Sequence, residues 1–282
     1  MRPEGRRFAP APCFRGHDVG SERQRRSYNR SMAELITIPF SHYCEKARWA
    51  LDRAGVEYEE RRYLPGFHVR PARRAARGRG RADAHSSAAS TPILVMGADS
   101  ICGSSAIVRH AEPALFSSPE VEALVERYDD ALGPHTRRIA YWFILGQRGL
   151  FQRLADDNAP RAQAWALRLA LPLLGSRLRA RLKVDRPGFE RSVVRVDAIA
   201  DEVAAQLADG RPYLTGDAFT AADLTFAALF SPVILPGPDR YGATLPPLEL
   251  FSDEGRATVE RYRAHPAGQF AARMFDAHRR GP

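Results

Sequence analysis

Two residues that could handle a reactive sulfur atom, Ser41 and Cys44, stand three positions apart early in the chain. A short apolar run precedes Ser41, and small or apolar residues recur at helical spacing after it, at Ala47, Ala50, Leu51 and Ala54. The first turn of a helix offers unpaired backbone N–H groups and about half a positive charge, which together stabilise an anion. The pattern therefore predicts a turn from strand to helix at which a thiolate would be stabilised beside Ser41.

One hydroxyl group and a helix terminus can supply the free energy that is needed to ionise a thiol at such a turn. A free thiol with a pKa of about 8.5 is only about 3% ionised at pH 7, whereas a pKa about two units lower makes it roughly three-quarters ionised. This shift needs about 2.7 kcal/mol. One hydrogen bond to a charged group contributes about 1.5–3 kcal/mol and a helix terminus about 0.3–1 kcal/mol, so no general base is needed.

A second informative segment covers residues 90–107. Pro92 opens an apolar strand, Gly97 and Asp99 mark a tight turn, and a second short strand leads to a helix that begins near Ser104. The predicted order of elements from Glu34 is strand, helix, strand, irregular stretch, strand, strand and helix. The third of these elements, a strand, is expected at residues 56–63.

A third segment, residues 216–224, predicts a strongly capped helix. Thr220 can cap the helix, and Asp223, at its third position, can reach back to the backbone of the cap. Phe219 and Leu224 occupy the positions of a hydrophobic staple around this cap. We interpret Thr220 and Asp223 as structural residues of a core helix.

These three segments, in this order, resemble the glutathione S-transferase family over roughly residues 34–278. The resemblance implies an α/β thioredoxin-like N-terminal domain, expected at 33–113, followed by an all-α helical C-terminal domain, expected at 118–280. Pro134 is expected to kink an early helix of the second domain, because proline removes an N–H group and clashes with a carbonyl. Residues 1–32, rich in Arg and Pro, are expected to be a disordered tail or a gene-model extension.

The resemblance also implies the site residues. Ser41 takes the catalytic position, where it would stabilise the thiolate of the co-substrate glutathione, and Cys44 takes the usually more buried fourth position of the turn. The resemblance further implies a cis bond between Thr91 and Pro92 that exposes backbone to the cysteinyl part of glutathione. Other expected contacts are Ser104 and Ser105 with the glutamyl carboxylate, and Tyr128, His135, Tyr141 and Trp142 with the electrophilic substrate.

Three functions remain open at this point. Conjugation of glutathione to small electrophiles is favoured, with glutathione-dependent thiol–disulfide exchange through Cys44 as an alternative. A non-catalytic protein with the same fold is the third, because Gly103 stands where the family commonly has an acidic residue before the serine. Ser41 and Ser104 could each also be ordinary helix caps, and Cys44 an ordinary buried thiol.

The distribution of charge along the chain argues against a nucleic-acid-binding protein. The net charge of +9 comes from +5 in residues 1–32 and +5 in residues 68–90, which leaves −1 for the rest, and neither basic segment has interleaved aromatic residues. Nucleic-acid binding is therefore not expected. We interpret 68–90 as a solvated low-complexity loop, with a basic wall that attracts glutathione carboxylates as the alternative.

Cysteine content and hydropathy suggest where the protein works. The three cysteines, Cys13, Cys44 and Cys102, are too few and too irregularly spaced for a disulfide framework or a metal site. No apolar run reaches the 18 or so residues of a membrane span. A reducing, cytoplasmic location is expected, and family habit suggests a homodimer.

Overall fold

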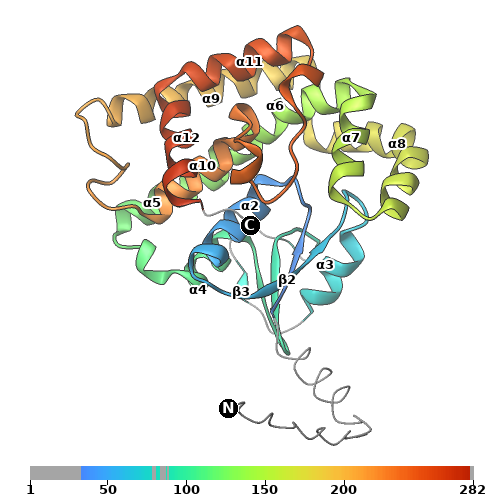
Figure 1. The fold of residues 1–282 in the computed structure, drawn as a ribbon, viewed down its shortest axis with the longest axis horizontal. Helices are drawn as coiled ribbons and strands as arrows, with labels where there is room; N and C mark the ends of the chain where they lie inside the picture. The colour runs from blue at the N-terminus through green and yellow to red at the C-terminus, as the bar shows by residue number, and fades with distance from the viewer. Residues whose placement is uncertain (1–32, 78–80, 83–86, 88, 280–282) are drawn as a thin grey trace, which may run out of the picture.

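The computed structural model describes residues 33–77, 81–82, 87 and 89–279. The prediction of a disordered tail falls on residues 1–32, which lie outside the described part. The described chain forms an α/β domain followed by a helical domain, so the predicted fold class is confirmed (Figure 1).

The described part of the α/β domain is built on a mixed sheet with the strand order β2-β1-β4-β5-β3. Strand β1 runs parallel to β2 and antiparallel to β4, β4 runs antiparallel to β5, and β5 runs parallel to β3. The strands are β1 (Ala33–Thr37), β2 (Tyr58–Arg62), β3 (Arg81–Ala82), β4 (Ile93–Met96) and β5 (Asp99–Cys102). The predicted strand at 56–63 is thus present as β2.

Alternation along the strands sends side chains to two apolar layers. On one face, Leu35 and Leu94, which are partners across β1 and β4, pack against Leu51 and Ile107. These two helical residues belong to α2 (His42–Arg53) and α4 (Ser104–Ala111). On the opposite face, neighbouring strand residues pack against Ala72 of α3 (Val69–Ala75). Helix α2 is therefore held on the sheet by its own apolar stripe.

Helix α3 corrects the prediction that residues 68–90 form a loop throughout. Its sequence is dominated by Arg and Ala, which are both good helix formers, and the methyl group of Ala72 is fully buried against the sheet. The helix propensity of Arg and Ala, together with the buried contact of Ala72, explains why residues Val69–Ala75 form a short helix.

The helical domain surrounds one helix that is buried on nearly every side, α10 (Ala221–Ile234). Asp223 accepts hydrogen bonds from the backbone N–H of Thr220 and from that of Leu214, both at 2.8 Å, which confirms the predicted capping role. The helices packed against α10 are α2, α5 (Pro119–Ala131), α6 (Gly133–Gly146), α11 (Asp253–Ala264) and α12 (Pro266–His278), and α9 (Arg186–Gln206) packs in turn against α6 and α12. Three short 3-10 helices cover Pro113–Leu115, Pro238–Arg240 and Leu248–Leu250.

The chain breaks between α5 and α6 rather than bending within one helix. Pro134 lies in the first turn of α6, where its missing N–H group costs no hydrogen bond, so the predicted kink becomes a helix end and a new start. At the break, Gly133 has no side chain, and a Cβ atom there would overlap the hydroxyl group of Tyr43. The break is therefore in direct contact with the start of α2.

Two further helices, α7 (Arg148–Asn158) and α8 (Arg161–Leu182), form a hairpin on the same side of the molecule as α3 (Figure 1). Their shared apolar cluster includes Phe151 and Leu167 and extends to Leu64, in the loop after β2. The hairpin thus packs against the α/β domain as well as belonging to the helical domain. None of the described helices combines the length and the hydropathy of a membrane-spanning segment.

Candidate functional site

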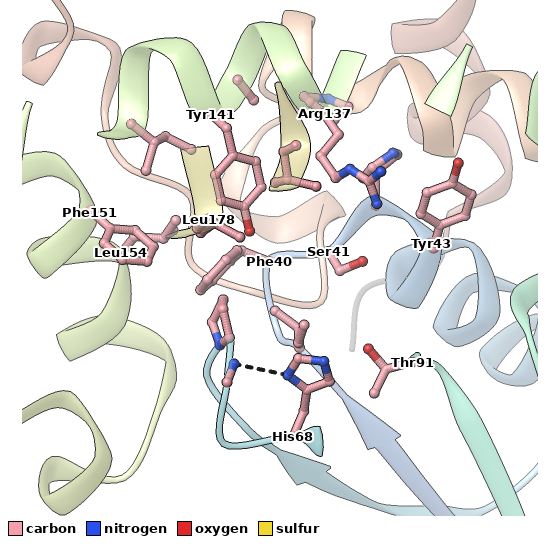
Figure 2. Close-up of a pocket in the computed structure, with 18 of the residues that line it drawn as sticks. Phe40, Ser41, Tyr43, His68, Thr91, Arg137, Tyr141, Phe151, Leu154 and Leu178 are labelled. Carbon is pink, nitrogen blue, oxygen red and sulfur yellow. Dashed lines mark hydrogen bonds between the residues drawn. The ribbon is translucent and has the colours of Figure 1, made fainter. Parts of the chain in front are cut away.

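A cavity of about 450 Å³ lies between the sheet domain, α6 and the α7–α8 hairpin (Figure 2). This volume falls in the usual range of sites for small ligands. Ser41 and Thr91 line it from the sheet domain, Arg137 and Tyr141 from α6, and the α7–α8 hairpin contributes an apolar wall. Part of that wall is labelled in the figure as Phe151, Leu154 and Leu178.

Ser41 occupies the predicted turn from strand to helix. Its backbone is extended and its carbonyl oxygen accepts the first helical hydrogen bond, from the N–H of Glu45 at 2.9 Å. The hydroxyl group makes no capping hydrogen bond; it interacts with the thiol of Cys44, and the side chain lines the cavity (Figure 2). The side chain is thus not an ordinary helix cap, and its hydroxyl is accessible to a ligand.

Arg137 reaches over the start of α2 from the opposite wall of the cavity (Figure 2). Its guanidinium group makes no hydrogen bond or ion pair with any residue that the structure describes. The charge is felt by the neighbouring groups, because it contributes to lowering the pKa of His42. Sequence reasoning missed Arg137, although it precedes the predicted wall residue Tyr141 by four positions and so shares its helix face.

His42 is held neutral beside the cavity. Burial, with the charge of Arg137 adding to it, lowers the pKa of this imidazole to about 3. Its Nε2 lies 2.9 Å from the carbonyl oxygen of Gly133, to which it donates a hydrogen bond. The residue therefore acts as a link between α2 and α6 rather than as a proton carrier near pH 7.

Two other side chains of α2 fix it to the helical domain. Tyr43 donates a hydrogen bond to the carbonyl oxygen of Asp129 at 2.9 Å. Lys46 Nζ lies 2.8 Å from Asp129 Oδ1, and both side chains are almost completely buried. The position of Ser41 relative to Arg137 is thus set by contacts that cross between the domains.

Cys44 lies beneath the turn and is not part of the cavity lining. Its side chain is fully buried, and Sγ donates to Thr91 Oγ1 at 3.6 Å. Burial raises the pKa of this thiol, an effect that the charge of Arg48 only partly offsets. A neutral, inaccessible thiol argues against a redox nucleophile at this position.

The bond between Thr91 and Pro92 is cis, as the resemblance implies. Thr91 lines the cavity below Ser41 in the view of Figure 2, whereas the buried Pro92 does not reach it. The carbonyl group of Pro92 accepts a hydrogen bond from the N–H of Gly103 at 3.0 Å, which joins β4 to the start of α4.

Ser104 and Ser105 are placed differently from the expectation. Neither side chain lines the cavity, and Ser104 is buried. The Ser105 hydroxyl accepts a hydrogen bond from Lys46 and donates one to Asp129, so it belongs to the buried ion pair between α2 and α5. The sequence could not show that a charged pair from two other elements would take this hydroxyl.

Of the four expected wall residues, only Tyr141 lines the cavity. Burial raises the pKa of its hydroxyl to about 12, so it stays protonated. Tyr128 packs in the core against Phe226, His135 lies 3.0 Å from the hydroxyl of Ser192, and Trp142 stacks on Phe189. The apolar wall comes instead from the α7–α8 hairpin, whose packing no local pattern indicated.

Among the residues that the structure describes, no cluster of three or more His, Cys, Asp or Glu side chains could hold a metal ion. The site combines a hydroxyl, a cation and a phenol around an apolar space. Such a set can hold an anionic nucleophile next to an apolar reactant.

Comparison with protein families gives two matches. Residues 35–117 match the family described as glutathione S-transferase, N-terminal domain, and residues 186–264 match glutathione S-transferase, C-terminal domain. No curated protein sequence matches the chain at a significant level.

Solved structures with a similar fold include three enzymes of low sequence identity. A glutathione S-transferase of Ceriporiopsis subvermispora in complex with glutathione is 17% identical, covers 89% of this chain and 99% of its own, and has a TM-score of 0.55. A glutathione transferase of Phanerochaete chrysosporium is 15% identical, with coverages of 88% and 97% and a TM-score of 0.54. A beta-etherase of Sphingobium is 15% identical, with coverages of 85% and 98% and a TM-score of 0.52. At these identities the similarity is one of fold.

Proposed function

The chain belongs to the glutathione S-transferase family, and on this premise we propose that it binds glutathione in the cavity and transfers its thiolate to an electrophilic carbon. The observation that carries this proposal is the joint orientation of the Ser41 hydroxyl and the Arg137 guanidinium into one cavity at the start of α2 (Figure 2). A sulfur atom between them would receive a hydrogen bond from one side and a positive charge from the other.

These two groups are sufficient to ionise the bound thiol at neutral pH. A hydrogen bond from Ser41 contributes about 1.5–3 kcal/mol when the acceptor is charged. The positive charge of Arg137 attracts the thiolate as well, and this attraction weakens less with distance in a cavity that holds little water than it would in bulk solvent. Because lowering the thiol pKa by about two units needs about 2.7 kcal/mol, no side chain has to remove the proton as a general base.

Other contacts would hold the tripeptide. Thr91 offers its backbone next to Ser41, as the resemblance implies for the cysteinyl part of glutathione. Arg73 of α3 lines the cavity and could pair with a carboxylate, which agrees with the alternative interpretation of 68–90 as a basic wall. The expected side-chain role of Ser105 is not supported, because its hydroxyl is committed to Lys46 and Asp129.

In the reaction, the glutathione thiolate attacks the electrophilic carbon, a C–S bond forms, and the leaving group departs with its electron pair. Tyr141 remains protonated, so its hydroxyl can donate a hydrogen bond to charge that develops on the electrophile. The apolar wall of Phe151, Leu154 and Leu178 excludes water from the reacting atoms.

Calorimetry with glutathione and a conjugation assay with a neutral aryl halide test this proposal. We expect binding in the micromolar to millimolar range and formation of the thioether product. No heat of binding at millimolar glutathione would contradict the proposal and favour a non-catalytic protein with this fold.

A further inference from the structure

The lining of the cavity is unusually basic. It contains four arginines, Arg73, Arg137, Arg177 and Arg181, and no aspartate or glutamate among the residues that the structure describes. Within that part of the chain, none of the four makes a hydrogen bond or an ion pair. A concave, partly apolar surface lined by charge of one sign concentrates ligands of the opposite sign.

Two of these arginines come from α8 and share its cavity-facing side. Arg177 and Arg181 are one helical turn apart, and both flank the apolar stripe that α8 turns toward the cavity. This stripe consists of Leu167, Leu171, Leu178 and Leu182. Burial lowers the pKa of His68, whose ring lies on the sheet side of the cavity (Figure 2), and the charge of Arg181 adds to this effect, so that charge is felt across the cavity.

Glutathione does not account for all of this charge. As the thiolate it carries two carboxylates and one sulfur anion against one ammonium group. Arg137 faces the proposed sulfur position and Arg73 is available for one carboxylate. Even if the second carboxylate pairs with another arginine, at least one of Arg177 and Arg181 keeps no anion from glutathione. The pair also lies in α8, outside the segments 35–117 and 186–264 that match the family.

We propose that Arg177 and Arg181 bind the anionic group of the acceptor substrate, an apolar molecule that carries a carboxylate or sulfonate. Its apolar part packs against Phe151, Leu154 and Leu171, while the anion stays at the exposed arginines of α8. This inference rests on the proposed function, because it names the class of electrophile that the same cavity takes. The charged end orients the substrate, and the reactive carbon then points toward Ser41.

The inference is tested on the full chain with a matched pair of ligands, 4-phenylbutanoate and 4-phenylbutanamide, by calorimetry. We expect the carboxylate to bind about ten-fold more tightly than the amide, and this preference to weaken as salt rises. The double variant Arg177→Gln/Arg181→Gln is expected to lose the preference while it still binds the amide. The control is Arg168→Gln, which removes the same charge from α8 at an exposed ion pair with Asp156 and is expected to keep the preference.

Glutathione binding is measured on the same proteins. Unchanged glutathione affinity in the double variant supports the inference. If the double variant loses glutathione affinity as much as carboxylate affinity, the two arginines hold glutathione and the inference is overturned, while the proposed function stands. Equal affinities of the wild type for carboxylate and amide overturn it directly. If the wild type prefers the carboxylate but does not bind glutathione, the anion site is supported and the proposed function is contradicted.

Discussion

Lys46 Nζ lies 2.8 Å from Asp129 Oδ1, and this buried ion pair joins α2, the helix that follows Ser41, to α5 of the helical domain. The same two residues also engage the hydroxyl of Ser105 at the start of α4. Three helices from two domains therefore meet at one charged pair, a few residues from the proposed site of chemistry. The pair explains how the turn at Ser41 keeps its place opposite Arg137.

Removing one member of this pair is expected to destabilise the fold strongly. Lys46→Met leaves the Asp129 carboxylate buried without its partner, which should cost about 3–5 kcal/mol of unfolding free energy. The double variant Lys46→Met/Asp129→Leu should recover most of this loss, because no unpaired charge remains. Urea denaturation of the wild type, the single variant and the double variant measures the free energy of unfolding. A double variant no more stable than Lys46→Met would show that the unpaired charge of Asp129 does not cause the loss.

Ser41→Ala should raise the pKa of enzyme-bound glutathione by about one to two units and slow conjugation at pH 7 by roughly ten-fold or more. The reason is the loss of one hydrogen bond to the thiolate. The ultraviolet difference spectrum of the thiolate, followed against pH, gives the pKa. An unchanged value would mean that backbone N–H groups of α2 hold the sulfur instead.

Arg137→Met should raise the same pKa by about one unit, because it removes the positive charge that faces Ser41, whereas Arg137→Lys should retain most of the effect. Arg153→Met serves as the control, since Arg153 forms an exposed ion pair with Asp157 on α7 and does not line the cavity. A rise of the same size in Arg153→Met would assign the shift to overall charge rather than to Arg137.

Cys44 should resist alkylation in the folded protein. Its thiol is buried and its pKa is raised by burial, so little thiolate exists at pH 8 and the reagent cannot reach it. Iodoacetamide labelling followed by mass spectrometry is expected to modify Cys44 only after unfolding. Rapid labelling of the native protein would instead favour the thiol–disulfide chemistry that the sequence left open.

The pH dependence of stability should carry a contribution from His42. Its pKa is about 3 in the folded protein and near 6.5 in the unfolded chain, so the unfolded state binds the extra proton between these values. The contribution is complete above about pH 6.5 and is lost as the pH falls, by about 2 kcal/mol at pH 5. His42→Gln should flatten this part of the profile in urea titrations at pH 5 to 8, relative to wild type.

Most of the fold could be predicted from the sequence, because its signals are local. The turn at Ser41, the two strands after Thr91 and the capped helix at Thr220 each depend on residues close together in the chain, and the structure confirms all three. Helix α3 was missed because its one decisive contact, Ala72 against the sheet, comes from strands distant in sequence.

The site was predicted only in part, because many of its contacts join residues that are far apart in the sequence. Ser41, Thr91 and Tyr141 reach the cavity as expected, but the partners of the other candidates come from elsewhere in the chain. Ser105 is taken up by Lys46 and Asp129, which are 59 and 24 residues away from it. The sequence by itself determined most of the local elements, and it placed the start of α2 directly after Ser41. Only the packing of the two domains decided that Arg137 and the arginines of α8 would face that residue across one cavity, because such contacts depend on the relative placement of whole helices.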